Sequence, residues 1–108
     1  MKRPRGRLYD ILKANGFTPF EIRVYKTVSS IPWGTVKTYK WVAYKIKNPR
    51  SFRAVGQALN KNPFPLVIPC HRVIREDGGI GGFAYGGSKL KKKLLEYEKV
   101  GIIKTTDD

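Results

Sequence analysis

The chain has 108 residues, which suffices for one domain with a modest hydrophobic core and is too short for two. Its 22 Lys and Arg residues against 8 acidic ones give a net charge of +14, which favours a polyanionic partner but leaves a basic ribosomal or simply soluble protein open. One Cys excludes an internal disulfide and a Cys-rich zinc site, and no apolar run approaches the ~20 residues of a membrane span, so we expect a cytoplasmic protein outside membranes.

The N-terminal residues predict a basic arm and a short helix. Residues 1–7 are basic and interrupted by a Pro and a Gly, so we expect either an arm that contacts phosphates or a solvated tail. No signal-peptide apolar core follows them. Residues 8–12 favour a short helix that ends near Asn15 and Gly16.

A capping box predicts the next helix. Thr18 at the N-cap, a Pro at the first helical position and Glu21 at the third begin a helix over residues 19–29. Phe17, just before the cap, is placed to pack on Ile22. The side chains that recur on one face of this helix, and that we expect in the core, are Phe20, Val24 and Val28.

Two short helices joined by a tight turn follow. Thr38 caps a helix over residues 39–46, and Ser51 caps a second over residues 52–59. Such a pair is typical of a helix-turn-helix, although an ordinary helical hairpin has the same pattern. Gly56 costs helix stability relative to Ala, which indicates a close approach to another helix or to a DNA backbone.

Residues 63–73 hold the only Cys and the only His, the neighbours Cys70 and His71. The apolar run at residues 66–68 predicts a short buried strand that Pro69 ends, because proline has no N–H for a ladder. A thiol is a nucleophile only as its thiolate, and an adjacent imidazole in a basic surrounding promotes its formation near neutral pH. Most such pairs are instead an inert buried thiol beside a surface histidine.

The remaining chain predicts a strand, a glycine-rich loop and a helix. Residues 73–75 favour a strand, and residues 77–79 favour a turn. Six of the ten residues from 78 to 87 are Gly, so this backbone can lie against a flat ligand while Phe83 and Tyr85 wall it. A flexible linker is the alternative.

The last helix is predicted over residues 89–99, with Ser88 as its cap and an end near Gly101. Leu90, Leu94 and Tyr97 share one face and are expected to pack inward. Residues 91–93 are three lysines that we expect to be mostly solvated.

Together these motifs resemble the O6-alkylguanine-DNA alkyltransferases, which are direct-reversal DNA repair proteins. The resemblance covers residues 17–101, most of the chain. The segments that carry it are Gly34–Tyr39, Arg53–Leu59, Pro69–Val73 beginning seven residues after Asn62, and Gly79–Glu98. It implies an α/β, mostly helical fold, a single small domain with a helix-turn-helix and a short strand element beside the active-site cysteine. The catalytic domain would span residues 8–101, between the arm at 1–7 and a tail at 102–108.

The resemblance implies irreversible, single-turnover transfer of an alkyl group from O6-alkylguanine in duplex DNA to Cys70, the activity of a methylated-DNA-protein-cysteine S-methyltransferase. His71 would act through a water as base toward Cys70, and Glu98 would orient His71, by the logic of a Cys-His-acid triad. Asn62 would shape the active turn, and Tyr39 would crowd the target phosphate and give a proton to the base. Without this family match, Glu98 at the end of a Lys-rich helix would be read as a surface charge. Asn62 before a Pro would be read as a turn former.

The target atom lies inside a base pair, so the nucleotide must leave the stack. By resemblance Arg53 fills the gap left behind, in a minor-groove complex. Other implied DNA contacts are Thr38, Tyr39, Ala54, Gly56 and Arg72. The implied alkyl and guanine pocket is Leu59, Val73, Phe83 and Tyr85. No metal or cofactor is implied, and we expect a monomer that binds lesion-containing double-stranded DNA.

Two other functions stay open. Typical relatives carry an additional N-terminal domain, whereas this sequence begins almost at the catalytic one. Short relatives include the alkyltransferase-like proteins, which bind the lesion without transfer and recruit other repair factors. Those proteins replace the cysteine, commonly by Trp, so Cys70 favours transfer. A Cys-dependent hydrolase would need water to regenerate the thiol from a thioether, and no residue suggests how.

Overall fold

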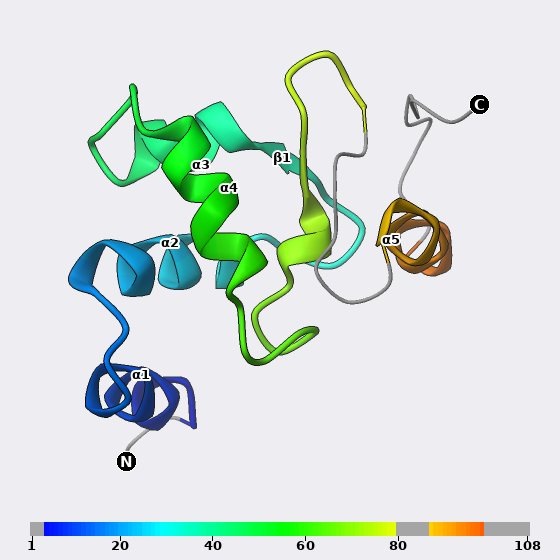
Figure 1. The fold of residues 1–108 in the computed structure, drawn as a ribbon. Coiled ribbons are helices and arrows are strands. Elements are labelled where there is room, and N and C mark those ends of the chain that lie inside the picture. Colours follow the sequence, from blue (N-terminus) through cyan, green and yellow to red (C-terminus); the bar gives the residue numbers. More distant parts are fainter. Residues whose placement is uncertain (1–3, 80–86, 99–108) are drawn as a thin grey trace.

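The computed structural model describes residues 4–79 and 87–98, whose arrangement Figure 1 shows. The elements in chain order are α1 (Pro4–Ala14), α2 (Pro19–Ser29), β1 (Lys37–Thr38), α3 (Tyr39–Lys45), α4 (Phe52–Asn60), the 3-10 turn η1 (Cys70–Arg72), β2 (Val73–Ile74) and α5 (Gly87–Tyr97). This described part is mostly helical with one two-stranded sheet. The predicted fold class is therefore confirmed.

Helix α2 forms as its sequence predicts. The Thr18 hydroxyl accepts a hydrogen bond from the Glu21 backbone N–H at 3.1 Å, and the Glu21 carboxylate accepts one from the Thr18 N–H at 2.9 Å. These two bonds satisfy N–H groups that the helix itself leaves unpaired. Val24 and Val28 are fully buried and Phe20 packs partly buried against them, which confirms the predicted core face.

The hydrophobic core lies where α2, α3 and α4 meet. Val42 of α3 and Val55 of α4 are fully buried there. Tyr25 of α2 is buried too, and its hydroxyl donates to the Ala58 carbonyl of α4 at 2.7 Å. Because α2 is bonded to α4 in this way, the helix-turn-helix pair α3 and α4 is held on a fixed support. Phe17 meets the edge of the Tyr25 ring, with centroids 5.9 Å apart.

The two predicted caps of the helix-turn-helix differ. The Thr38 hydroxyl accepts from the Trp41 N–H at 3.0 Å and so caps α3. Ser51 stands at the N-cap of α4, but its hydroxyl donates to the Asn48 carbonyl at 2.7 Å and makes no cap bond. The predicted side-chain cap at Ser51 is therefore wrong, because the tight turn before α4 offers this hydroxyl a nearby carbonyl.

The small sheet joins two distant parts of the chain. Strands β1 and β2 pair in parallel, with Lys37 opposite Val73 and Thr38 opposite Ile74. Since α3 begins directly after β1, and η1 ends directly before β2, this pairing brings the start of α3 beside the turn that holds Cys70.

The predicted strand at residues 66–68 is wrong. Leu66 has a positive φ of 75°, and the side chains of Leu66 and Val67 are 61% and 64% exposed. Only Ile68 is buried, and its N–H bonds back to the Phe64 carbonyl at 2.9 Å. Prolines on both sides of this run remove ladder donors, so a tight turn forms where the apolar residues alone predicted a strand.

Helix boundaries differ from the prediction at both ends of the chain. Helix α1 begins at Pro4, so residues 4–7 are helical rather than an irregular arm. Proline suits a first helical turn because its missing N–H has no partner there. Helix α5 begins at Gly87, so Ser88 lies in its first turn and not at a cap. The predicted end near Gly101 lies outside the described residues.

The buried face of α5 differs in part from the predicted one, since of the three predicted side chains only Leu94 packs against the core. Leu90 is 40% exposed and Tyr97 is 74% exposed, whereas the buried side chains are Lys91, Leu95 and Glu98. These three recur at the helical spacing of four and three residues. The expected solvation of Lys91 is therefore wrong, since it is 1% exposed. None of the helices in the described ranges is long and apolar enough to cross a membrane.

Candidate active site

Cys70 begins η1, the turn that links the apolar loop to β2. Its side chain is buried, and its N–H bonds to the Ile68 carbonyl at 2.7 Å. Burial raises the pKa of the Cys70 thiol, while a hydrogen bond with the Asn62 side chain and the Lys91 charge act in the opposite direction. At neutral pH the resting Cys70 is thus a thiol. The adjacent His71 in the sequence had predicted a thiolate.

His71 lies beside Cys70 and is paired with Glu98. The His71 Nε2 atom is 2.7 Å from a Glu98 carboxylate oxygen, and both side chains are buried. Burial lowers the pKa of His71 more than Glu98 raises it. The neutral ring therefore donates its Nε2 proton to the carboxylate, which leaves Nδ1 as the basic nitrogen. His71 Nδ1 is buried without a hydrogen-bond partner among the described residues.

Glu98 is held as a carboxylate by two partners. Burial by itself would raise the pKa of Glu98, but the hydrogen bonds from Arg72 and His71 outweigh it and hold that pKa below its ordinary value. Arg72 donates to both carboxylate oxygens, from Nε and Nη2, each at 2.9 Å. This two-point contact fixes the plane of the carboxylate and so the direction in which it orients His71.

The turn before β1 supports this network from the other side. Arg72 Nη1 donates to the Ile31 carbonyl at 2.8 Å, and its guanidinium lies 5.8 Å from the Trp33 ring centroid. Trp33 in turn meets Tyr97 edge to face at 5.5 Å. Gly34 has a φ of 81°, and a side chain there would meet the Glu98 carbonyl oxygen at 3.4 Å.

Asn62 closes the loop that carries Cys70, in line with what the family resemblance implied. It is fully buried, its amide N donates to the Ile68 carbonyl at 2.8 Å, and its amide O accepts from the Phe64 N–H at 2.9 Å. These bonds close the loop on both sides of its exposed tip. Asn62 also hydrogen-bonds toward Cys70, where it favours the thiolate.

Lys91 is a site residue that the sequence reasoning missed. Its ammonium donates to the Tyr39 hydroxyl at 3.4 Å and is electrostatically coupled to Cys70. Burial lowers the pKa of Lys91 to about 8, and burial first, then the Cys70 charge, raises the pKa of Tyr39. Lys91 lies seven residues, or about two helical turns, before Glu98. The two side chains therefore share one helix face, and this spacing could have predicted that Lys91 lies at the site.

The predicted DNA contacts fall into two groups. Arg53 is exposed on the first turn of α4, and Ala54 and Gly56 are partly exposed beside it. A Cβ added at Gly56 would lie 3.9 Å from the Tyr39 ring, an ordinary contact, so no neighbour in the described part of the chain demands this glycine. Thr38, by contrast, uses its hydroxyl to cap α3.

Arg72 is not placed as predicted. Its guanidinium is engaged by Glu98 and the Ile31 carbonyl, and its side chain is 13% exposed. An arginine whose donors are used in this way does not offer a free fork to a phosphate. Arg72 instead fixes the carboxylate of Glu98, which accepts from His71.

The predicted pocket residues are only partly described. Leu59 and Val73 are buried members of the hydrophobic core. Phe83 and Tyr85 lie outside the described residues. Within residues 4–79 and 87–98 no group of three His, Cys, Asp or Glu side chains could hold a metal ion.

The chain matches the family model of the 6-O-methylguanine DNA methyltransferase, DNA binding domain, over residues 19–100. It is 52% identical over 92 residues to the methylated-DNA–protein-cysteine methyltransferase of Methanothermobacter thermautotrophicus, covering 85% of this chain and 51% of the relative. The Sulfolobus acidocaldarius protein of that name is 57% identical over 83 residues, covering 77% and 51%. The chain spans about half the length of the curated relatives it matches.

Two solved structures show the same fold. Mycobacterium tuberculosis OGT in complex with DNA has a TM-score of 0.74 and 43% identity, over 76% of this chain and 50% of that one. S. pombe Atl1, in complex with damaged DNA containing O6-carboxymethylguanine, has a TM-score of 0.69 and 37% identity. Here the match covers 81% of this chain and 82% of the other.

Proposed function

Since the chain belongs to the 6-O-methylguanine DNA methyltransferase family, we propose that it binds duplex DNA and transfers the alkyl group of O6-alkylguanine irreversibly to Cys70. The sulfur forms a bond to the alkyl carbon, and the bond between that carbon and guanine O6 breaks. The product is a thioether, so each molecule, acting as a monomer, reacts once. The observation that carries the proposal is the buried Cys70, His71 and Glu98 arrangement beside Tyr39 and Lys91.

Deprotonation of Cys70 would run through His71. The neutral ring offers Nδ1 as a base, and Glu98 stabilises the imidazolium that forms. Because burial raises the thiol pKa, the thiolate would form at the moment of reaction rather than persist. A thiolate kept only transiently avoids oxidation and metal binding before a lesion arrives.

Proton delivery to guanine would run through Tyr39. When the bond to O6 breaks, the purine carries a developing negative charge that a proton must neutralise. The Tyr39 hydroxyl, which accepts from the Lys91 ammonium, would give that proton and be resupplied by Lys91. The positive charge of Lys91 would also favour the Cys70 thiolate.

Helix α4 would enter the DNA and extrude the lesion. Arg53 stands exposed at the start of this helix, where its side chain can replace the flipped base in the stack. The small side chains beside it let the helix approach a shallow groove closely. Such contacts are largely to the DNA backbone, which suits a search for lesions in any DNA sequence.

Lesion binding without transfer is the second candidate. One observation favours it, because S. pombe Atl1, in complex with damaged DNA, has the same fold at a TM-score of 0.69 and 37% identity. Cys70 favours transfer, because the neighbouring Asn62 and Lys91 side chains both favour its thiolate form.

Intact mass after incubation with duplex DNA containing O6-methylguanine separates the two. We expect a gain of one methyl group, located on the Cys70 peptide and absent from Cys70→Ala, which should still bind the lesion. Tight lesion binding with an unchanged mass would instead assign the protein to the alkyltransferase-like class.

A further inference from the structure

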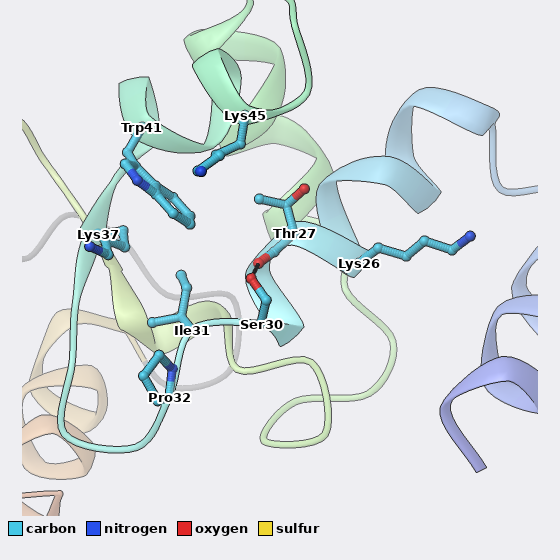
Figure 2. Close-up of a pocket in the computed structure, with 8 residues that line it drawn as sticks. All are labelled: Lys26, Thr27, Ser30, Ile31, Pro32, Lys37, Trp41 and Lys45. Atoms are coloured by element: carbon cyan, nitrogen blue, oxygen red, sulfur yellow. Dashed lines mark hydrogen bonds between the residues drawn. The ribbon is translucent and has the colours of Figure 1, made fainter. Parts of the chain in front are cut away.

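Away from the candidate active site, a surface pocket is formed by the end of α2, the turn after it, β1 and α3. It has a volume of about 420 Å³, and its lining residues are Lys26, Thr27, Ser30, Ile31, Pro32, Lys37, Trp41 and Lys45 (Figure 2). No lining residue comes from α4, η1, β2 or α5. In Figure 2, α4 lies behind α2 and α3, so this hollow, the lysine-tryptophan pocket, is not on the α4 face.

Two lysines are fixed at this pocket by an aromatic ring. The ammonium groups of Lys37 and Lys45 lie 5.2 Å and 5.6 Å from the Trp41 ring centroid. Both contacts are cation–π interactions, which hold a flexible side chain in place without neutralising its charge. Lys37 precedes Trp41 by four residues and Lys45 follows it by four, so β1 and α3 place one cation on either side of it in sequence.

These cations have no acidic partner in the described part of the chain. Neither Lys37 nor Lys45 comes within ion-pair distance of a carboxylate there. The third lining lysine, Lys26, turns its ammonium away, over the Tyr9 ring of α1 at 5.2 Å. Two positive charges thus lie against one aromatic ring, at a hollow where the described residues pair neither of them with a carboxylate.

The walls of the pocket suit a nucleotide unit. Ile31 and Pro32 give an apolar floor for a deoxyribose, and Thr27 and Ser30 bring hydroxyl groups to the opposite side. The Ser30 hydroxyl already donates to the Thr27 carbonyl at 2.5 Å, so of these two hydroxyl groups the Thr27 one is the candidate donor to a phosphate. The volume is in the range of sites that hold small groups of this size, roughly 300 to 1,000 Å³.

We propose that the lysine-tryptophan pocket binds a backbone phosphate of a second DNA segment while α4 holds the first. The proposal rests on the DNA-binding half of the proposed function and needs no transfer chemistry. A net charge of +14 exceeds what one short duplex interface neutralises. A protein with two separate phosphate sites can pass from one DNA segment to another without full release, which shortens the search for a lesion.

The test compares two double variants with equal loss of charge. Lys37→Ala with Lys45→Ala removes the pocket cations, and Lys89→Ala with Lys93→Ala removes two exposed lysines of α5 as the matched control. Energy transfer between donor-labelled and acceptor-labelled undamaged duplexes reports bridging by one protein molecule. We expect the pocket variant to lose most bridging, and its salt slope for the second duplex to fall by about 1, because one lost phosphate contact removes about 0.9. The control should stay near the parent protein.

Three results would overturn the proposal. Equal loss of bridging in both variants would mean that diffuse charge suffices. Weaker binding of a single lesion duplex by the pocket variant would place these lysines in the lesion interface. Competition by inorganic phosphate or dAMP at the concentration of duplex phosphates would identify a small-anion pocket. Methyl transfer to Cys70, read from intact mass in the same samples, is a separate readout, so bridging without transfer would defeat the proposed function and leave this inference standing.

Discussion

Lys91 and Tyr39 lie 52 positions apart in the chain, yet the ammonium of Lys91 donates to the Tyr39 hydroxyl at 3.4 Å and lies 5.6 Å from the centroid of its ring. Burial lowers the pKa of Lys91 to about 8 and raises the pKa of Tyr39. A buried lysine costs folding free energy, so its presence here indicates a task that stability does not explain.

Lys91→Met should slow transfer and stabilise the fold. Methionine fills similar volume without the charge, so the loss of proton supply and of thiolate support should reduce the transfer rate by about 10²-fold or more. Transfer is measured from single-turnover mass spectra. Lys93→Met is the matched control, since Lys93 is exposed on the same helix, and an equal loss of rate there would contradict the role of Lys91.

The stability difference between Lys91→Met and the parent should depend on pH. The folded pKa of Lys91, about 8, lies below its unfolded value of 10.5, so the unfolded chain binds more protons between these values and the parent gains stability as pH rises through them. Below pH 8 the penalty of burying the charge is complete, roughly 3 kcal/mol. Urea unfolding at pH 7 and pH 10 should therefore show the variant's advantage shrinking, and a constant difference would contradict the buried charge.

Local signals in the sequence predicted much of the fold. The capping box at Thr18, the cap at Thr38 and the α2 core face depend on neighbours within one helical turn, and all are found. The burial of Lys91 depends on Tyr39 and Cys70, which reach it only through the β1 and β2 pairing. The helical spacing of apolar residues predicted that Leu90 faces inward, yet it is exposed. Such a pattern contains no information on which polar groups find partners elsewhere in the chain.

The resemblance predicted the pairing of His71 with the distant Glu98, but it did not predict the partners of Arg72 or of Lys91. Cys70, His71 and Asn62 lie on one loop, and the structure brings them together. Arg72 was assigned to DNA by the family resemblance, but Glu98, which lies 26 residues away in the chain, accepts its hydrogen bonds. The exposed tip at Leu66 escaped prediction because three prolines outweigh the β propensity of the run between them.

Glu98→Gln should destabilise the protein and nearly abolish transfer. The amide keeps the shape but leaves the partly buried Arg72 charge without its anionic partner, which costs about 3 kcal/mol. His71 also loses the group that orients it. Urea unfolding at pH 7 and the single-turnover rate measure the two effects. Glu96→Gln, at an exposed position two residues before it, should change neither, and a transfer rate preserved in Glu98→Gln would contradict the triad.

Acid should destabilise the protein through the same pair. The folded pKa values of His71 and Glu98 are both lowered. Their contributions are therefore complete above the unfolded values of 6.5 and 4.5 and are lost as pH falls through the folded ones, since unfolding takes up protons there. Thermal unfolding between pH 7 and pH 3 should show a falling midpoint. Glu98→Gln should flatten the part of this curve below pH 4.5, and an unchanged slope there would contradict the assignment.

Gly34→Ala should damage the site, and Gly16→Ala should not. Both glycines have a positive φ, 81° and 87°, so alanine costs about 1 to 2 kcal/mol of stability at either position. At Gly34 the new Cβ also meets the Glu98 carbonyl oxygen at 3.4 Å, whereas at Gly16 it meets nothing within 4 Å. We expect similar shifts in the urea midpoint but a slower transfer rate for Gly34→Ala alone. Equal rates in the two variants would show that this turn does not position the acid.

Arg53→Ala should weaken extrusion of the lesion more than it weakens general DNA binding. Without the side chain the space left by the flipped nucleotide stays empty, and the unstacking cost of a few kcal/mol is no longer offset. Fluorescence of 2-aminopurine placed beside O6-methylguanine reports flipping, and a labelled undamaged duplex reports general affinity. Arg23→Ala removes an exposed arginine of α2 and serves as the charge-matched control. Both variants could lose flipping in proportion to their loss of affinity for undamaged DNA. That result would show that Arg53 contributes only charge and would contradict its gap-filling role.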